Sequence, residues 1–184
     1  MGYNECVSYS FIDENSAKLF GGGDASTQLE NPISSEMSHM RPDLFPGLLQ
    51  AASRNQARGF FNMALFELGP VFNGGDPGNQ QNNLSGVLIG QTASKDVHGQ
   101  NREVDVFDVK CHIENILSLI GAPSKLQILL GAEYNWHPGR HGRICLGPKK
   151  TIGIFGELHP KILSSFDIKG PTVGFTILLD NIPT

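Results

Sequence analysis

The chain has 184 residues, of which 39% are hydrophobic, and this length and composition suit one domain with a single sizeable core. A net charge of −4 gives no general electrostatic case for nucleic-acid binding. No segment approaches the roughly 18 apolar residues that a membrane helix needs, so no membrane association is expected. The three cysteines, Cys6, Cys111 and Cys145, have no paired spacing. They indicate reduced thiols and predict a cytoplasmic protein.

The first element is expected near the N-terminus. Residues 5–12 alternate in polarity, with Val7, Tyr9 and Phe11 on one face, and this pattern predicts a strand.

A short helix is expected next. Asp13 can cap it, and it should reach Phe20 and end at the glycine run 21–24. This run is interpreted as a turn and not as a phosphate loop, because no Gly-Lys-Ser/Thr follows it. A short strand is then expected over residues 27–31.

A helix and a long strand occupy the next forty residues. Pro46 suits the first turn of a helix over 42–58, which Gly59 ends. Residues 61–72 then predict a strand whose two faces are both apolar except at Glu67. Such a strand should be central in its sheet and covered on both sides.

The middle of the chain begins with a polar connection, 73–83, and a returning strand, 84–90. Residues 91–105 have no period and predict an excursion. Residues 107–121 then repeat apolar side chains at helical spacing, with Asp108 as the expected cap.

The remaining elements are mostly strands separated by turn-length connections, which favour antiparallel pairing. The sequence therefore predicts an α+β fold with helices packed on an antiparallel sheet. The expected strands are 125–131, 143–147, 150–158 and 172–180, with a short helix over 160–166.

Three histidines and a carboxylate are the first candidate site. His137 and His141 have the spacing of a helical zinc pair, but Pro138 between them argues for a loop. Glu157 and His159 alternate onto one face of a strand, as an acid–base pair would. The competing interpretation makes Glu157 a hydrogen-bonded strand-end residue followed by a helix start. A small metal-dependent hydrolase that uses these four residues stays open as an alternative function.

A group of basic residues is the second candidate site. The group flanks aromatic residues and could contact RNA phosphates, although so few charges are more often a solvated hairpin face. It consists of Arg140, Arg143, Lys149 and Lys150.

An ordered set of segments resembles the beta subunit of bacterial phenylalanyl-tRNA synthetase across essentially the whole chain. The segments read SYSFID, LENPISSEMSHMRPDLFPGLLQAASRN, LFELGPVF, FDVKCHIENIL, HPGR and IGIFGELHPKIL. The resemblance is to the catalytic-like module of that subunit. It implies a class II synthetase core, an antiparallel sheet flanked by helices. It also implies that residues 1–184 are one module of a longer subunit, whose editing and anticodon-binding modules lie outside this chain.

The departures from a catalytic class II core are equally informative. Catalysis in that class needs an arginine on the motif-two strand and another in a glycine-rich motif-three helix, because adenylate formation develops negative charge. The strand LFELGPVF carries Glu67 and no arginine, and no Gly-x-Gly-x-x-Arg segment follows residue 166. The resemblance therefore implies no catalytic, cofactor-binding or metal-binding residue here. ATP and magnesium would be used by the holoenzyme.

The implied role is architectural. The module is expected to pack against the alpha subunit in an enzyme of two alpha and two beta subunits, with tRNA contacted by the holoenzyme. Helix 42–58 and strand 61–72 are the expected contacts, since both have apolar surface that needs cover. Arg41 would be a structural residue or an interface ion pair. The other residues assigned structural or interface roles are Pro46, Glu67, Glu157 and His159.

Overall fold

The computed structural model describes residues 1–92, 101–131 and 135–183. Part of the predicted excursion 91–105 therefore lies outside the described residues. The main sheet has seven strands in the order β1-β4-β5-β9-β8-β7-β6. These strands are β1 (Asn4–Glu5), β4 (Met63–Phe72), β5 (Gln80–Ile89), β6 (Gln127–Leu129), β7 (Trp136–Leu146), β8 (Lys150–Leu158) and β9 (Thr172–Leu178).

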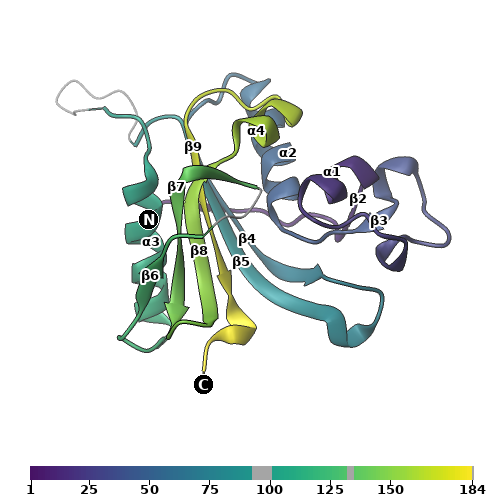
Figure 1. The fold of residues 1–184 in the computed structure, drawn as a ribbon. Helices are drawn as coiled ribbons and strands as arrows, with labels where there is room; N and C mark the ends of the chain where they lie inside the picture. Colours follow the sequence, from purple (N-terminus) through teal and green to yellow (C-terminus); the bar gives the residue numbers. More distant parts are fainter. Residues whose placement is uncertain (93–100, 132–134, 184) are drawn as a thin grey trace.

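Helices cover both faces of this sheet (Figure 1). α3 (Val106–Leu119) packs on one face, against β8 and β9. α2 (Phe45–Gln56) packs on the other face, against β4 and β5, with α1 (Glu14–Leu19) and α4 (Pro160–Ser165) close to it. A small second sheet pairs β2 (Phe11–Ile12) with β3 (His39–Met40) beside α1. Short 3-10 turns span Ala25–Thr27, Ser35–Met37, Pro77–Asn79 and Leu179–Asn181.

The pairing in the main sheet is antiparallel throughout except between β1 and β4, which run parallel. β5 lies between β4 and β9. After β5 the chain therefore passes through α3 and forms β6, β7 and β8 before it returns to the middle of the sheet as β9. The predicted α+β class with an antiparallel sheet and flanking helices is confirmed. No helix in the described part of the chain is long and apolar enough to cross a membrane.

Each face of the sheet has its own hydrophobic cluster. On the α2 face, Phe45, Leu48 and Leu49 are fully buried against strand residues such as Val87. On the α3 face, Val109 and Ile113 are fully buried against residues of β8 and β9. The apolar stripes read from the helical period are therefore the surfaces by which α2 and α3 bind the sheet.

The strand predicted over residues 5–12 is wrong. The chain forms β1, then an irregular segment, then β2, and the Val7 side chain is 92% exposed. The cause is a tertiary contact, because the Ser8 amide donates its hydrogen bond to the Glu67 carboxylate and not to the backbone of a neighbouring strand. Residues 27–31 also form no strand. Only Gln28 makes a single bridge, to His39.

Two further expectations change. β4 is not a central strand covered on both faces, since it lies second from the edge beside the two-residue β1, and on one of its faces Leu68 is 57% exposed. The cap of α3 is Asp105 and not Asp108, whose carboxylate instead accepts from the Asp105 amide at 2.9 Å and completes a capping box. The helix start at Pro46 is confirmed, since proline occupies the first turn of α2.

Candidate functional site

The three histidines proposed as metal ligands each make hydrogen bonds within the fold. His141 is buried, and its Nδ1 donates to the His137 carbonyl oxygen at 2.9 Å. His159 is the N-cap of α4, with Nδ1 accepting from the Lys161 amide at 3.1 Å. The HPGRH segment lies in β7 and not in the predicted loop, with an irregular register before His141. Within the described residues, no group of three or more His, Cys, Asp or Glu side chains could hold a metal ion.

Glu157 forms an ion pair with Arg140 and does not form an acid–base pair with His159. Its Oε1 accepts from Arg140 Nη1 at 3.1 Å, and Arg140 Nη2 lies 3.2 Å from His137 Nε2. This cluster is exposed at the end of β8, where α4 begins at Pro160. An exposed ion pair of this kind contributes little to stability.

The basic group does not form one patch. Lys150 lies opposite Leu146, at the hairpin end of β7 and β8, whereas Arg140 lies beside the other end, next to the pairing of His141 with Gly156. Leu146 comes six positions after Arg140 along the strand, which corresponds to roughly 20 Å. Arg143 lies between them and is partly buried. This arrangement therefore does not favour the binding of one RNA strand to all four residues as a single patch.

Arg41 and Glu67 form the most buried charged contact in the described part of the chain. Arg41 Nη1 donates to Glu67 Oε1 at 2.6 Å, with the side chains 4% and 3% exposed. Ser8 Oγ donates to Glu67 Oε2 at 2.7 Å and accepts from Arg41 Nη1 at 3.0 Å. Arg41 Nε donates to the Pro70 carbonyl oxygen at 2.9 Å. The network ties the N-terminal segment, the residues before α2 and β4 together.

The third member of this network, Ser8, is a residue that the sequence analysis did not single out. The only sequence signal for Ser8 is that small polar residues occupy every second position of 6–10, on the face opposite Val7 and Tyr9. That alternation predicts two faces but not which carboxylate the inner face meets. Gly47 of α2 leaves room for Ser8, because a Cβ there would lie 2.3 Å from Ser8 Oγ.

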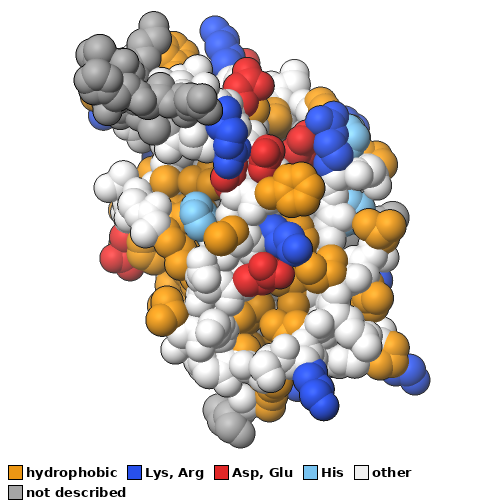
Figure 2. Space-filling view, turned by 90° about the vertical axis from the view of Figure 1, so that its left-hand side faces the viewer, with side chains coloured by type: hydrophobic (Ala, Val, Ile, Leu, Met, Phe, Trp, Pro, Cys, Tyr) orange, Lys and Arg blue, Asp and Glu red, His pale blue; other side chains and the backbone are white. Residues whose placement is uncertain are grey.

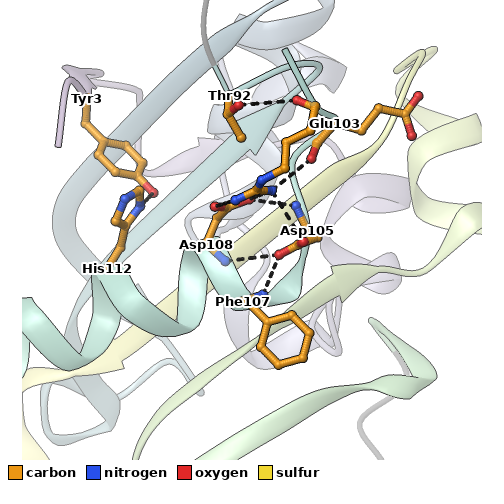
Figure 3. Close-up of polar contacts among 8 residues, drawn as sticks. Tyr3, Thr92, Glu103, Asp105, Phe107, Asp108 and His112 are labelled. Carbon is orange, nitrogen blue, oxygen red and sulfur yellow. Dashed lines mark hydrogen bonds and ion pairs between the residues drawn. The ribbon is translucent and has the colours of Figure 1, made fainter. Parts of the chain in front are cut away.

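The start of α3 gathers a second set of titratable residues (Figure 3). Arg102 donates to Asp108 Oδ2 at 2.8 Å, and this hydrogen bond lowers the pKa of Asp108. One turn along the helix, His112 Nδ1 lies 3.0 Å from the hydroxyl of Tyr3. Burial raises the pKa of Tyr3 and lowers the pKa of His112. The contacts cap the helix and join it to β1, and they provide no nucleophile with a base beside it.

The α2 face of the sheet carries the polar side chains that could serve a substrate. β4 and β5 contain no arginine, and the residue at the centre of β4, Glu67, is already paired with Arg41. Ser85 and Thr176 bond to each other at 2.8 Å. Next to them a cavity of about 170 Å³ is lined by neutral side chains such as Asn83 and Asn135, with Asp43 as its carboxylate. A site that stabilises a transferred phosphoryl or adenylate group requires fixed cations, and none of the described residues that line this cavity is a cation.

Comparison with known proteins assigns the chain to a family. Residues 1–179 match the family model described as the phenylalanyl tRNA synthetase beta chain CLM domain. The chain belongs to this family. It is 62% identical over 183 residues to the phenylalanine–tRNA ligase beta subunit of Ruegeria pomeroyi and 58% identical to that of Cereibacter sphaeroides. Each match covers 100% of this chain but only 23% of the relative, so the chain corresponds to under a quarter of those subunits.

Solved structures show the same architecture at low sequence identity. A pyrrolysyl tRNA synthetase of Desulfitobacterium hafniense superimposes with a TM-score of 0.68 at 15% identity, covering 98% of this chain and 59% of that one. A second structure of the enzyme from the same organism gives 0.65 at 16% identity. This likeness shows that the chain has the same fold as these synthetase structures, and the antiparallel sheet flanked by helices is the one that the resemblance implied.

Proposed function

We propose that this CLM-domain chain is a packing module of a cytoplasmic phenylalanine–tRNA ligase and performs no adenylation itself. In this proposal the alpha subunit carries the chemistry with ATP and magnesium, in an assembly of two alpha and two beta subunits that together contact tRNA. The observation that carries the proposal is the Arg41–Glu67 pair. It places on β4 a carboxylate that is already paired with a cation, where a catalytic class II core would need a free arginine.

An apolar strip beside β4 supports a role in subunit contact. β1 pairs with β4 in parallel, with Glu5 opposite Phe66, and the Cys6 amide donates to the Phe66 carbonyl oxygen at 2.7 Å, so the chain leaves β1 next to β4. Because Ser8 turns inward to Glu67, its neighbours Val7 and Tyr9 turn outward. Val7, Tyr9 and Leu68 are 92%, 71% and 57% exposed. Exposed apolar residues gathered in this way are typical of protein interfaces.

The α2 helix, in contrast, supplies little apolar surface for a partner. Its apolar residues Phe45, Leu48 and Leu49 have no exposed surface in the chain on its own. Of the two contacts expected from the sequence, the strand therefore remains the stronger candidate. The proposed contact consists of Val7, Tyr9 and Leu68, which we call the β4 strip.

The β4 strip is tested by substitution. Val7→Lys with Leu68→Lys should weaken binding of the alpha subunit at least tenfold, because two charges would have to be desolvated in the contact. Ile33→Lys is the matched control, since Ile33 is 93% exposed and lies outside the strip. Titration calorimetry with purified alpha subunit gives the affinities. Equal binding by the strip variant and the control would refute the location.

The absence of adenylation chemistry needs its own experiment. The 184-residue chain alone should give no phenylalanine-dependent exchange of pyrophosphate into ATP, with the alpha–beta enzyme as the positive control. Measurable exchange by the 184-residue chain alone would contradict the proposal.

A further inference from the structure

Four cations without ion pairs gather at the C-terminal end of α2. Within the described residues, most other cations of the helices pair with carboxylates, such as Lys110 with Glu114. None of the four makes an ion pair or a side-chain hydrogen bond among the described residues, and all are exposed. They are Arg54, Arg58, Lys161 and Lys169.

Two of these residues come from helices that the fold brings together, and the other two follow the ends of the same helices: Arg58 follows α2 and Lys169 follows α4. Arg54 of α2 and Lys161 of α4 line one open groove of about 910 Å³, which Lys18 of α1 also lines. Gln56, at the end of α2, donates to the Lys169 carbonyl oxygen at 2.8 Å and accepts from the Lys169 amide at 2.9 Å. Lys169 is thereby fixed beside the end of α2. The remaining lining of the groove supplies hydroxyl and amide groups from Asn15, Gln50, Ser53 and Ser165.

The local charge differs in sign from that of the whole chain. The groove and the end of α2 carry five cations, the four above and Lys18, against the three carboxylates of Asp13, Glu14 and Asp167, which gives +2. The complete chain has a net charge of −4. A positive area on an otherwise acidic protein concentrates polyanions at one place on its surface.

Two exposed aromatic rings follow Arg58 in the sequence, and one of them, Phe60, lines a separate hollow together with Asn55, the residue after Arg54. Phe60 and Phe61 are 62% and 52% exposed and come immediately after Arg58 and Gly59. The segment is held in place, since the Phe60 amide donates to the Asn55 carbonyl oxygen at 3.1 Å. Exposed aromatic rings beside cations are what a single-stranded nucleic acid needs, because its bases stack on the rings while its phosphates meet the charges.

We propose that the end of α2 and the adjoining groove bind a single-stranded segment of RNA. Arg54, Arg58, Lys161 and Lys169 would contact its phosphates, and Phe60 and Phe61 would stack on its bases. An acidic peptide would satisfy the cations but would leave the two rings without a function. This surface differs from the β4 strip and from the dispersed basic residues of β7 and β8. Its test is therefore independent of subunit binding.

The test measures the fluorescence anisotropy of a labelled 12-nucleotide single-stranded RNA of mixed sequence with the 184-residue chain. Four phosphate contacts predict a slope of log affinity against log salt of about −3, or roughly a 50-fold loss between 50 and 200 mM salt. Arg54→Gln with Lys161→Gln removes two contacts and should halve this slope. Phe60→Ala with Phe61→Ala should weaken binding about tenfold with the slope unchanged, because stacking does not depend on counterion release.

Lys149→Gln with Lys150→Gln is the matched control, since it removes the same charge from exposed positions at the β7–β8 hairpin. All the substituted side chains are exposed, and thermal melting confirms that each variant is folded. The proposal predicts that the control keeps wild-type affinity. It is overturned if wild type shows no binding at 50 mM salt, if the control loses as much affinity as the groove variant, or if polyglutamate displaces the RNA as well as unlabelled RNA does.

Discussion

Arg41 and Glu67 meet at 2.6 Å in the interior of the protein, 26 positions apart in the sequence. Removing both charges from water is costly, and the contact is maintained because Ser8 and the Pro70 carbonyl oxygen satisfy further donors and acceptors of the pair. The pair therefore joins the segment before α2 to β4.

The first prediction concerns this pair. Glu67→Gln should reduce the free energy of unfolding by about 3 to 5 kcal/mol, because it leaves the Arg41 guanidinium buried without a counter-charge. Combining Arg41→Met with Glu67→Leu should recover most of the lost free energy of unfolding, since an apolar pair of similar volume can replace a buried ion pair. Urea denaturation of the single and double variants measures both values. A double variant no more stable than Glu67→Gln would show that the charges themselves are needed.

Periodic features of the sequence predicted the parts of the fold that depend on local patterns. The stripe through Val109 and Ile113 predicted α3, and the proline at the first turn predicted α2. The order of the strands could not be predicted in the same way, because the pairing of β5 with β9 joins residues almost one hundred positions apart. The parallel pairing of β1 was missed for the same reason.

The candidate site shows where local patterns mislead. Residues 5–12 alternate as a strand does, but the partner of the Ser8 amide is a side chain of β4. The pattern around His137 and His141 suggested a loop because of its proline and glycine, whereas β7 accommodates them through an irregular register. Glu67 was singled out correctly as unusual in an apolar strand, but its partners lie at distant positions that no spacing rule connects.

The second prediction concerns the cap of α3. Asp105→Ala should destabilise the protein by about 1 kcal/mol, because the Asp105 carboxylate accepts from the Phe107 amide at 2.8 Å and from the Asp108 amide at 3.3 Å. Glu103→Ala is the control, since Glu103 is exposed and only its carbonyl oxygen accepts a bond from Arg102. Thermal or urea denaturation compares the two variants. A loss of equal size in both would argue against a capping role.

The third prediction concerns pH. Burial lowers the pKa of His112, opposed by the charge of Asp108, so the unfolded chain binds a proton at a higher pH than the folded protein does. The stabilisation is complete above the unfolded pKa of about 6.5 and is lost as the pH falls through the lower folded pKa. His112→Gln keeps a hydrogen-bonding group near the Tyr3 hydroxyl but does not titrate. Denaturation between pH 7.5 and 5 should therefore give a shallower fall in stability for His112→Gln, and an unchanged fall would assign the pH dependence to other groups.

The fourth prediction concerns the close approach of α2 to the sheet. A Cβ at Gly174 of β9 would lie 2.8 Å from the Phe45 ring and 2.9 Å from the Gly86 carbonyl oxygen. Because one of these neighbours is backbone, the sheet itself must shift to admit a methyl group. Gly174→Ala should therefore destabilise the protein by about 1 to 3 kcal/mol. Gly139→Ala is the control, since a Cβ there meets no atom within 4 Å and the backbone is not in a left-handed conformation. Urea denaturation distinguishes the two, and equal stability of both variants would mean that α2 can move away from β9 at little cost.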